Sequence, residues 1–461
     1  MPSHIAIAGA GISGLTTAYA LEQRGHRVTI FEANDHAGGP VRTIERDGYR
    51  LETGPHTLLV RHRLVAEFLD ELGLEEDIRE ANDDASTRYV VRNGRPVPVP
   101  MSPPDLLTTD LLTPAARLRL LIEPLIPARD GDDAVDETLA SFVQRRLGVE
   151  VLDYAVDPLV GGIFAGDPGR LSARHSFERL VEFEEDAGSI VLGAIRSKLN
   201  SIGSEDDSAP RRLLSFDGGM QTLVDRLVDR IDADIHFNSP VRKLRRDDDD
   251  WRVIYQRGNA RRGDSFDAVV LTMPTHTLGT LEWENARPPA GAIDELTTLP
   301  YAPCCVVSLG FERRRVGHAL DGFGVLVPKV ENFHILGSLF VSSMFDATAP
   351  DDHVNLTVFV GGARQPELTE RSDGDICELA LHDVRRLLDI DGAPQFTHLT
   401  RWKRAIPQYE VGHQVFLDHI DDIERALPQI YFAGNFRDGI GLPNLMQQAP
   451  EHARRIDEAL S

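Results

Sequence analysis

The chain has 461 residues, with 73 Asp or Glu against 49 Lys or Arg, so its formal net charge is −24. A chain this acidic repels phosphate, which excludes nucleic acid as the expected partner and disfavours general attraction to anionic lipid. Its apolar fraction of 41% is ordinary for a globular protein of a size that buries a large core. The length alone predicts about three domains.

Cysteine and histidine are placed without any metal-binding or disulfide pattern. Cys304, Cys305 and Cys377 show no C-x-x-C spacing, and the 16 histidines show no H-x-H or H-x-x-x-H pair. We therefore expect a reducing compartment and no metal. The sequence has no basic-then-apolar leader and no apolar run near the about 20 residues that span a bilayer. These features predict a cytoplasmic protein without a signal peptide.

The first elements lie in HIAIAGAGISGLTTAYALEQRGHRVTIFEA, from His4 to Ala33. A short apolar strand leads into a G-x-G-x-x-G turn, and a helix follows that ends at Gly25. A second apolar strand ends at Glu32. The complete β-α-β pattern with its terminal acid predicts a dinucleotide site, and a glycine-rich turn in an unrelated α/β fold is the minor alternative.

Each residue of this turn has a specific physical task. Gly9 permits the tight turn, Gly11 leaves room for a pyrophosphate, and Gly14 lets helix and strand pack closely. The helix N-terminus favours the negative phosphates. Glu32 is placed to accept hydrogen bonds from the adenosine ribose.

A second glycine-rich block distinguishes FAD from a nicotinamide cofactor. GGPVRT (38–43) follows the second strand, and LETGPH (51–56) comes soon after. A nicotinamide domain needs neither the extra glycine pair nor the arginine. The longer pyrophosphate and ribityl chain of a flavin needs both. Arg42 is expected to pair with the diphosphate, with an ordinary surface arginine as the alternative. The block is similar to the GG-x-x-R-T signature of the flavin amine oxidase superfamily.

The next stretch predicts a helix and a hairpin. RLVAEFLDELG (63–73) predicts an amphipathic helix with Leu64, Phe68 and Leu72 facing the core, stopped by a glycine. Asn93-Gly94 between apolar strands in RYVVRNGRPVPVP (88–100) predicts a β-hairpin.

From residue 103 to 212 the pattern is helical with proline punctuation. LRLLIEPLIP (118–127) is unusually apolar for a segment with so many prolines. We expect a buried helix end there, and contact with a membrane surface is the open alternative.

The α/β pattern returns after residue 215. A helix with Leu223, Leu227 and Ile231 on one face is expected, then strands that include residues 268–271, and the four aspartates at 247–250 form a solvated hairpin tip. Near the C-terminus, IYFAGNFRDGIGLPNL (430–445) predicts a strand and a helix whose N-terminus favours negative charge on a reduced flavin.

Several specific blocks occur in one order along nearly the whole chain, namely AGDP (165–168), GFGVLVP (322–328), FVGGARQPEL (359–368) and AIPQYEVGH (405–413). On these blocks the chain resembles the oxygen-dependent protoporphyrinogen oxidase family of haem synthesis. The resemblance implies an FAD enzyme that takes a hydride from a bridging carbon of a porphyrinogen onto flavin N5, with dioxygen as acceptor and hydrogen peroxide as product. Three rounds with proton loss give the porphyrin.

The resemblance also implies residue roles. Arg88 is expected to pair with a propionate of the tetrapyrrole, Leu326 and Leu339 to hold one face of the macrocycle, and Phe359 to stack on the other. Gly162 matches a backbone position against the substrate; no general base is identified. The expected FAD contacts are Gly9, Ala10, Gly11, Ile12, Ser13, Gly14, Glu32, Ala33, Gly39, Pro40, Arg42, Gly54, Pro55, His56, Thr57, Val241, Trp402, Gly434, Asn435, Ile440, Gly441 and Leu442.

The segment DPLVGGIFAGDPGRLS (157–172) is too apolar for a loop and too rich in glycine for a strand. We expect Gly161, Gly162 and Gly166 to leave the main chain uncovered so that the flat ligand approaches it. The side chains of Leu159, Ile163 and Phe164 are expected to wall this slot.

The predicted architecture is α/β (α+β) with three domains. A discontinuous Rossmann-like FAD domain takes 1–75, 212–285 and 400–461, and a mixed-sheet substrate domain takes 76–102 and 286–399. A helical domain, for which membrane contact is an open alternative, is inserted at 103–211. A homodimer and contact with the inner face of the cell membrane are open alternatives for its association.

Three other activities stay open. Coproporphyrinogen III oxidation differs in its four propionates, for which Arg61, Arg63 and Arg92 are further candidate partners. An amine oxidase or desaturase is disfavoured because the strand CCVVSLGFER (304–313) offers no lysine for flavin N5. A non-catalytic flavin or porphyrin carrier is the third alternative.

Overall fold

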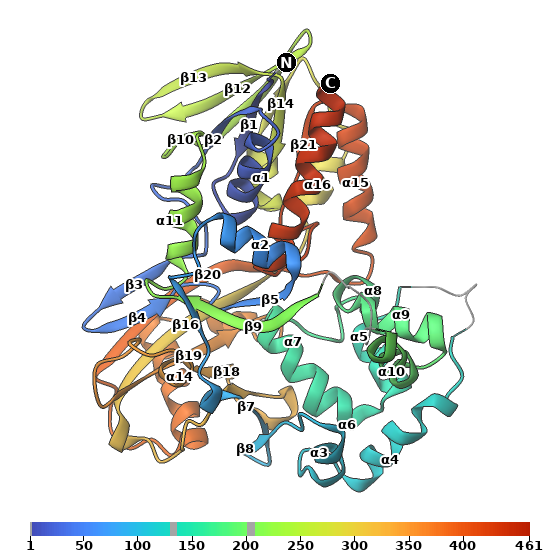
Figure 1. Ribbon diagram of the computed structural model, residues 1–461, viewed down its shortest axis with the longest axis vertical. Helices are drawn as coiled ribbons and strands as arrows, with labels where there is room; N and C mark the ends of the chain where they lie inside the picture. Colours follow the sequence, from blue (N-terminus) through green and yellow to red (C-terminus); the bar gives the residue numbers. More distant parts are fainter. Residues whose placement is uncertain (1, 130–135, 201–207) are drawn as a thin grey trace.

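The computed structural model describes residues 2–129, 136–200 and 208–461 of the chain. It combines helices with five sheets, as the α/β expectation required. Figure 1 shows a sheet with its helices at one end of the molecule, and a second large sheet beside a helical region at the other end. None of the described helices is both long and apolar enough to cross a membrane.

A parallel five-stranded sheet with strand order β10-β2-β1-β14-β21 forms the first end. Its strands are short and almost continuously buried, as strands covered on both faces must be. The chain enters this sheet from three separate stretches of sequence. The strands are β1 (His4–Ala8), β2 (Arg27–Phe31), β10 (Asp234–His236), β14 (Ala268–Leu271) and β21 (Ile430–Phe432).

The two faces of this sheet have separate apolar cores. Ile5 and Ile7 of β1 face four helices, whereas Ala6 and Ala8 face a four-stranded sheet with order β13-β12-β11-β15 and two helices. The first layer contains α1 (Ile12–Glu22), α2 (Arg63–Glu71), α11 (Gln221–Arg230) and α16 (Leu442–Leu460). The second contains β11 (Val241–Asp247), β12 (Asp250–Arg257), β13 (Ala260–Phe266), β15 (Glu282–Glu284), α12 (Ala292–Thr297) and α15 (Gln414–Ala426).

A mixed seven-stranded sheet with order β20-β16-β19-β18-β17-β7-β8 forms the second large unit. One of its faces packs on α14 and makes an apolar core of its own. The opposite face is turned toward the rest of the molecule. The elements are β7 (Thr87–Arg92), β8 (Arg95–Pro98), β16 (Tyr301–Glu312), β17 (Gly322–Leu326), β18 (Ile335–Phe340), β19 (His353–Gly361), β20 (Phe396–Pro407) and α14 (Asp373–Leu388).

Two small sheets join these units. The hairpin β3 (Thr43–Arg46) and β4 (Tyr49–Glu52) follows the second glycine block, and a three-stranded sheet has the order β5-β9-β6. Its strands are β5 (Leu58–His62), β6 (Ile78–Glu80) and β9 (Ser208–Phe216).

The helical region has a small apolar core around Phe142 and Phe164. Of the stretch 103–211 predicted to be helical, residues 130–135 and 201–207 lie outside the described part, and β9 takes up the end. Its helices are α3 (Pro103–Thr108), α4 (Pro114–Ile122), α5 (Leu139–Arg146), α6 (Val149–Val151), α7 (Asp157–Phe164), α8 (Ala173–Ser176), α9 (Glu178–Ala187) and α10 (Ile190–Asn200), with the turn η2 (Glu123–Leu125) after α4.

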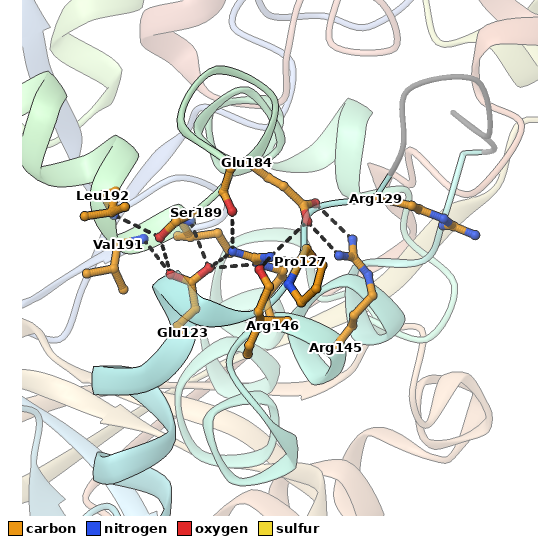
Figure 2. Close-up of polar contacts among 12 residues, drawn as sticks. Glu123, Pro127, Arg129, Arg145, Arg146, Glu184, Ser189, Val191 and Leu192 are labelled. Atoms are coloured by element: carbon orange, nitrogen blue, oxygen red, sulfur yellow. Dashed lines mark hydrogen bonds and ion pairs between the residues drawn. The ribbon is translucent and has the colours of Figure 1, made fainter.

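A buried ion pair lies at the centre of this region, shown in Figure 2. The side chains of Glu123 and Arg146 are both 0% exposed, and Arg146 Nε donates to Glu123 Oε1 at 2.8 Å. The Ser189 hydroxyl and the backbone N–H groups of Ile190 and Val191, at the start of α10, donate to the same carboxylate. Burial alone would raise the pKa of Glu123, but these hydrogen bonds hold it below its ordinary value. Arg146 also donates to the carbonyls of Ile126, Pro127 and Gly188.

Two expectations about the helices are wrong. Around α2, Leu72 and Phe68 face the core as predicted, but Leu64 is 49% exposed, and Val65 and Leu69 are the buried residues within the helix. The apolar run 118–127 is not a buried helix end, because Leu121 is 65% and Leu125 is 83% exposed. The polar Glu123 occupies the interior there instead.

Several local predictions are confirmed. Asn93 and Gly94, both with positive φ, connect β7 to β8 with Arg92 opposite Arg95. The helix after residue 219 buries Leu223 and Leu227, and the aspartate run turns between the antiparallel strands β11 and β12.

Candidate active site

The glycine turn between β1 and α1 has one position that the protein itself leaves open. A Cβ on Gly14 would lie 2.0 Å from the carbonyl oxygen of Gly9, and one on Gly9 would lie 2.8 Å from Thr272 Oγ1, so packing requires both glycines. A Cβ on Gly11 would meet no atom within 4 Å. Gly11 is therefore placed to give room to a group from outside the chain, as a pyrophosphate needs.

The carboxylate of Glu32 closes the far side of this turn. It is 6% exposed and accepts hydrogen bonds from the backbone N–H groups of Ala10 at 2.7 Å and Asn34 at 2.8 Å. The N–H of Ser239 donates to the Glu32 carbonyl, which brings Val241 at the start of β11 close to the same edge. These contacts hold the acid at the end of β2, where a ribose is bound in dinucleotide folds.

The second glycine block lies directly against the first. Gly38 pairs with Gly11 in an isolated bridge, and a Cβ on Gly39 would lie 3.7 Å from Gly11 Cα. Arg42 is exposed and makes no ion pair with another described residue, so its guanidinium is available for a diphosphate. Gly54 packs on this block, since a Cβ there would lie 2.3 Å from the Pro40 carbonyl oxygen.

The C-terminal loop before α16 is fixed by Tyr409. Its hydroxyl donates to the carbonyl of Asn435 and accepts from the N–H of Gly439 at 3.1 Å. The ring of Tyr409 stacks on His413 with centroids 4.2 Å apart, and burial lowers the pKa of His413 to about 4. The AIPQYEVGH block thus positions the loop that carries the predicted contacts Gly434, Asn435, Ile440, Gly441 and Leu442.

His56 connects the predicted flavin loop to the seven-stranded sheet. Its Nε2 lies 3.1 Å from Thr357 Oγ1, and its ring meets Phe359 edge-on with centroids 5.7 Å apart. Burial lowers the pKa of His56 to about 4, so the ring is neutral at pH 7. Trp402 makes a second connection by donating from Nε1 to the carbonyl of Thr53 at 2.7 Å.

Four of the predicted substrate residues lie on the same face of the seven-stranded sheet. Their strands are otherwise largely buried, yet Leu326, Leu339 and Phe359 are each half-exposed, and so is Arg88. Their neighbours Val325 and Val358 lie in the core toward α14, and side chains alternate along a strand, so these four point to the opposite face.

The strand register arranges these residues in two rows. Gly324 pairs with both Arg88 and Leu339, and Leu339 also pairs with Thr357. In the next row Gly337 pairs with both Leu326 and Phe359. Each row places a glycine between two side chains, so we call this face the platform (Arg88, Leu326, Leu339 and Phe359). Its shape suits a broad, apolar ligand with an acidic group.

The platform ends at a cavity of about 730 Å³. Arg88 lines the cavity and lies over the ring of Phe323, with Cζ 5.6 Å from the ring centroid. Burial and the charges of Arg211 and Arg61 lower the pKa of Arg88. Of the other arginines considered for propionates, Arg92 pairs with Glu150 and Arg63 with Glu67.

The glycine-rich segment 157–172 forms the expected open surface only in part. Residues 157–164 form α7, in which Leu159 and Ile163 are exposed and Phe164 is buried. Gly162 is exposed as expected, whereas Gly161 and Gly166 are buried. A Cβ would lie 2.8 Å from Arg364 Nη2 at Gly161, 2.7 Å from Leu326 Cδ2 at Gly162, and 2.8 Å from Gln408 Oε1 at Gly166. The glycines allow α7 to pack closely on the platform.

Arg364 is a functional residue that the sequence analysis missed. Its side chain is 5% exposed, pairs with Asp157 Oδ1 at 3.0 Å and donates to the carbonyls of Gly166 and Val327 at 3.3 Å. It thereby joins both ends of α7 to β17. The signal that could have found Arg364 was its place in the specific FVGGARQPEL block. Tyr409 was missed in the same way, and its signal was its place in AIPQYEVGH.

Comparison with known proteins agrees with this geometry. The chain matches the flavin containing amine oxidoreductase family over residues 12–455. It is 36% identical to the mitochondrial protoporphyrinogen oxidase of Nicotiana tabacum, with 95% of this chain and 91% of the relative covered. It is 27% identical to the coproporphyrinogen III oxidase of Staphylococcus aureus, with 99% of both chains covered.

Solved structures show the same fold. The crystal structure of a candidate protoporphyrinogen oxidase from an Exiguobacterium species superposes with a TM-score of 0.81 at 25% identity, covering 99% of each chain. A reduced UDP-galactopyranose mutase superposes with a TM-score of 0.73 at 16% identity, which shows the fold alone. The chain therefore belongs to the flavin containing amine oxidoreductases, as an FAD-dependent oxidoreductase in the branch that includes the protoporphyrinogen and coproporphyrinogen III oxidases.

Proposed function

We propose that this chain oxidises protoporphyrinogen IX to protoporphyrin IX in haem biosynthesis, with FAD bound in the glycine cradle and dioxygen as the acceptor. The single observation that carries the proposal is the half-exposed apolar platform, joined to the predicted flavin loop through His56. The relatives named protoporphyrinogen oxidase at 34% and 36% identity support this substrate.

FAD, when bound, supplies the redox chemistry by accepting a hydride from the substrate and returning the electrons to dioxygen. The residues of this chain bind and orient the two partners. Arg88 pairs with a propionate, while Leu326, Leu339 and Phe359 hold the macrocycle and exclude water from its reacting carbon. The neutral His56 holds the flavin loop against Phe359. Its ring hydrogen bonds to Thr357 and to the Gly54 backbone, so we assign it a positioning role.

The proposed cofactor residues divide by the part of FAD that they meet. The turn at 9–14, with Glu32, Ala33 and Val241, takes the adenosine and pyrophosphate. Gly39, Pro40 and Arg42 take the diphosphate and ribityl chain. The loop at 54–57, Trp402 and the loop at 434–442 would hold the isoalloxazine.

The test uses the purified chain with FAD. We expect a yellow protein whose flavin absorbance is bleached by protoporphyrinogen IX without oxygen and restored by air, with porphyrin fluorescence and hydrogen peroxide appearing together. A yellow protein that porphyrinogen does not reduce would contradict the proposal and would favour a flavin carrier. A colourless protein that cannot be reconstituted would contradict the FAD assignment itself.

Coproporphyrinogen III is the second candidate substrate. The observation in its favour is that Arg88 is accompanied by two other arginines, Arg61 and Arg211, which interact electrostatically with it. A comparison of kcat/KM for the two porphyrinogens under identical conditions decides between them.

We further propose that the helical region contacts a membrane surface. Leu118, Leu121 and Leu125 are 59%, 65% and 83% exposed, and α10, which begins beside η2, exposes Ile195 and Leu199. Aliphatic side chains on short amphipathic helices favour the interfacial layer of a bilayer, where an apolar substrate dissolves. Leu121→Glu together with Leu125→Glu should abolish sedimentation with neutral phosphatidylcholine vesicles. Unchanged sedimentation of the double variant would contradict the membrane contact. The contact would also be contradicted if the substitutions changed only the oligomeric mass in size-exclusion chromatography, because the leucines would then cover a surface between protein copies.

A further inference from the structure

Arg61, Arg88 and Arg211 form a cluster of arginines that has no acidic ion-pair partner among the described residues. Arg88 is on β7, Arg211 on β9 and Arg61 on β5, so three separate strands bring them together. None of these three side chains forms an ion pair with a described residue, although acidic residues outnumber basic ones in the chain, whose net charge is −24. Arg88 and Arg211 line the same cavity, and β5, which carries Arg61, pairs with β9. Burial, together with the charges of neighbouring arginines, lowers the pKa of Arg88 and of Arg61.

Arg211 lies in an irregular part of β9, between Arg212, which pairs with Val60, and Ser208, which pairs with His62. Arg212 forms an ion pair with Glu80 at 2.7 Å, whereas Arg211 forms none with a described residue. Arg211 lines the same cavity of about 730 Å³ as Arg88.

The other cavity-lining residues leave this pair of guanidinium groups available. Asp83, Asp105 and Asp110 also line the cavity, but none of them forms an ion pair with an arginine of the cluster in the described structure. Asp105 is engaged at the N-terminus of α3, where it accepts from the N–H of Ser102 at 3.0 Å. Phe323, Met101 and Leu213 provide apolar wall around the two guanidinium groups.

Uncompensated guanidinium groups in a partly apolar cavity attract carboxylates strongly, because the hydrogen bonds are charge-assisted and the solvent competes less. One propionate on Arg88 would leave Arg211 and Arg61 still repelling each other. A second carboxylate from the same ligand would offset one of these two positive charges and reduce their repulsion.

We propose that Arg211, supported by Arg61, binds a second carboxylate of the tetrapyrrole substrate beside the one held by Arg88. This proposal rests on the proposed function and names its substrate more closely as a macrocycle with at least two acidic side chains that reach the same cavity. Arg211 then determines specificity for acidic tetrapyrroles and takes no part in the redox step.

The experiment compares Arg211→Ala with the matched control Arg212→Ala, the neighbouring arginine on the same strand that already has its own carboxylate. The first arm measures KM and kcat for protoporphyrinogen IX. We expect Arg211→Ala to raise KM about tenfold, since each 1.4 kcal/mol corresponds to a factor of ten, with kcat nearly unchanged. Arg212→Ala should stay within about twofold of the wild type, as for most surface substitutions. Arg211→Lys should restore part of the loss.

The second arm measures binding of protoporphyrin IX and of its dimethyl ester to the FAD-loaded enzyme by fluorescence. The wild type should prefer the free acid, and Arg211→Ala should lose most of this preference, whereas Arg212→Ala should retain it. Equal behaviour of the two variants in both arms would overturn the proposal. If the wild type oxidises no porphyrinogen, the proposed function fails, and the binding arm still decides whether Arg211 recognises a carboxylate.

Discussion

Adjacent glycines in α7 should respond in opposite ways to the same substitution. Gly161→Ala directs a methyl group at the guanidinium of Arg364, at 2.8 Å from Nη2, whereas Gly162→Ala directs it at Leu326 Cδ2, at 2.7 Å. The first neighbour is a buried charged group with several fixed partners. The second is the flexible end of a half-exposed aliphatic side chain.

The magnitudes follow from these neighbours. Replacing a helical glycine by alanine stabilises a helix by about 1 kcal/mol. Breaking the buried pair between Arg364 and Asp157 costs about 3–5 kcal/mol. Gly161→Ala should therefore lower the free energy of unfolding by about 2–4 kcal/mol. Gly162→Ala needs Leu326 to move by about 1 Å to restore a normal contact distance, and its stability should stay within about 1 kcal/mol of the wild type.

The functional effects should be reversed. Movement of Leu326 changes the surface that we propose holds the macrocycle, so Gly162→Ala should raise KM for the porphyrinogen about tenfold, the factor for 1.4 kcal/mol. Gly161→Ala, in the fraction that stays folded, should keep a KM close to that of the wild type. The assays are denaturant unfolding in excess FAD and steady-state porphyrin fluorescence.

Two results would refute this reasoning. If Gly161→Ala were as stable as the wild type, Arg364 would not hold α7 as its contacts indicate. If Gly162→Ala left KM unchanged while flavin absorbance confirmed full loading, Leu326 would not contact the substrate. Gly374→Ala in α14 is the control for the effect of a glycine-to-alanine change on helix stability, because a Cβ there meets no close neighbour. Gly188 is also uncrowded, but its positive φ makes it unsuitable as a control.

Three further predictions concern buried groups. Burial raises the pKa of Glu52 to about 8, so at pH 7 this carboxyl is protonated in the folded protein and ionised in the unfolded one. The free energy of unfolding should therefore fall as the pH rises from about 4.5 to 8, with a loss of about 3 kcal/mol at pH 7. Glu52→Gln should flatten this decline in denaturant titrations at several pH values. Arg146→Leu leaves the Glu123 carboxylate buried without its partner and should lower stability by about 3–5 kcal/mol, whereas Arg179→Leu, an exposed arginine of the same region, should have little effect in the same titration. Tyr409→Phe removes the hydroxyl that holds Asn435 and Gly439, and it should weaken FAD affinity about tenfold in a flavin-release assay, with an unchanged affinity contradicting the role of Tyr409.

Local motifs were readable from the sequence because their physics is local. Gly9 has the positive φ of the tight turn, Gly14 packs against the carbonyl of Gly9, and Asn93-Gly94 adopts the positive φ of a hairpin turn. The Glu32 position follows from the length of one β-α-β unit. Each of these signals lies within a short stretch of sequence, although Thr272 also packs against Gly9 in the folded chain.

Other features depend on contacts between distant residues and could not be read in this way. The glycines of α7 look like a bare backbone surface until Arg364 and Leu326, about 160–200 residues later in the chain, are seen to fill the space beside them. Leu64 was assigned to the core in place of Val65 because the two neighbours are similarly apolar, whereas Phe68 and Leu72 pack on the core as predicted. Likewise Arg211 and Arg212 are indistinguishable in sequence, and only the structure shows that Arg212 pairs with Glu80 while Arg211 lines the cavity.

The ion pair of Glu123 and Arg146 has a mechanical consequence for the leucines outside it. The interior beneath η2 is occupied by the Glu123 carboxylate, which accepts hydrogen bonds from Arg146, Ile190 and Val191. Inward movement of Leu121 or Leu125 would disturb these bonds. Both leucines therefore stay exposed in the described structure, where they are accessible to an apolar surface of another molecule.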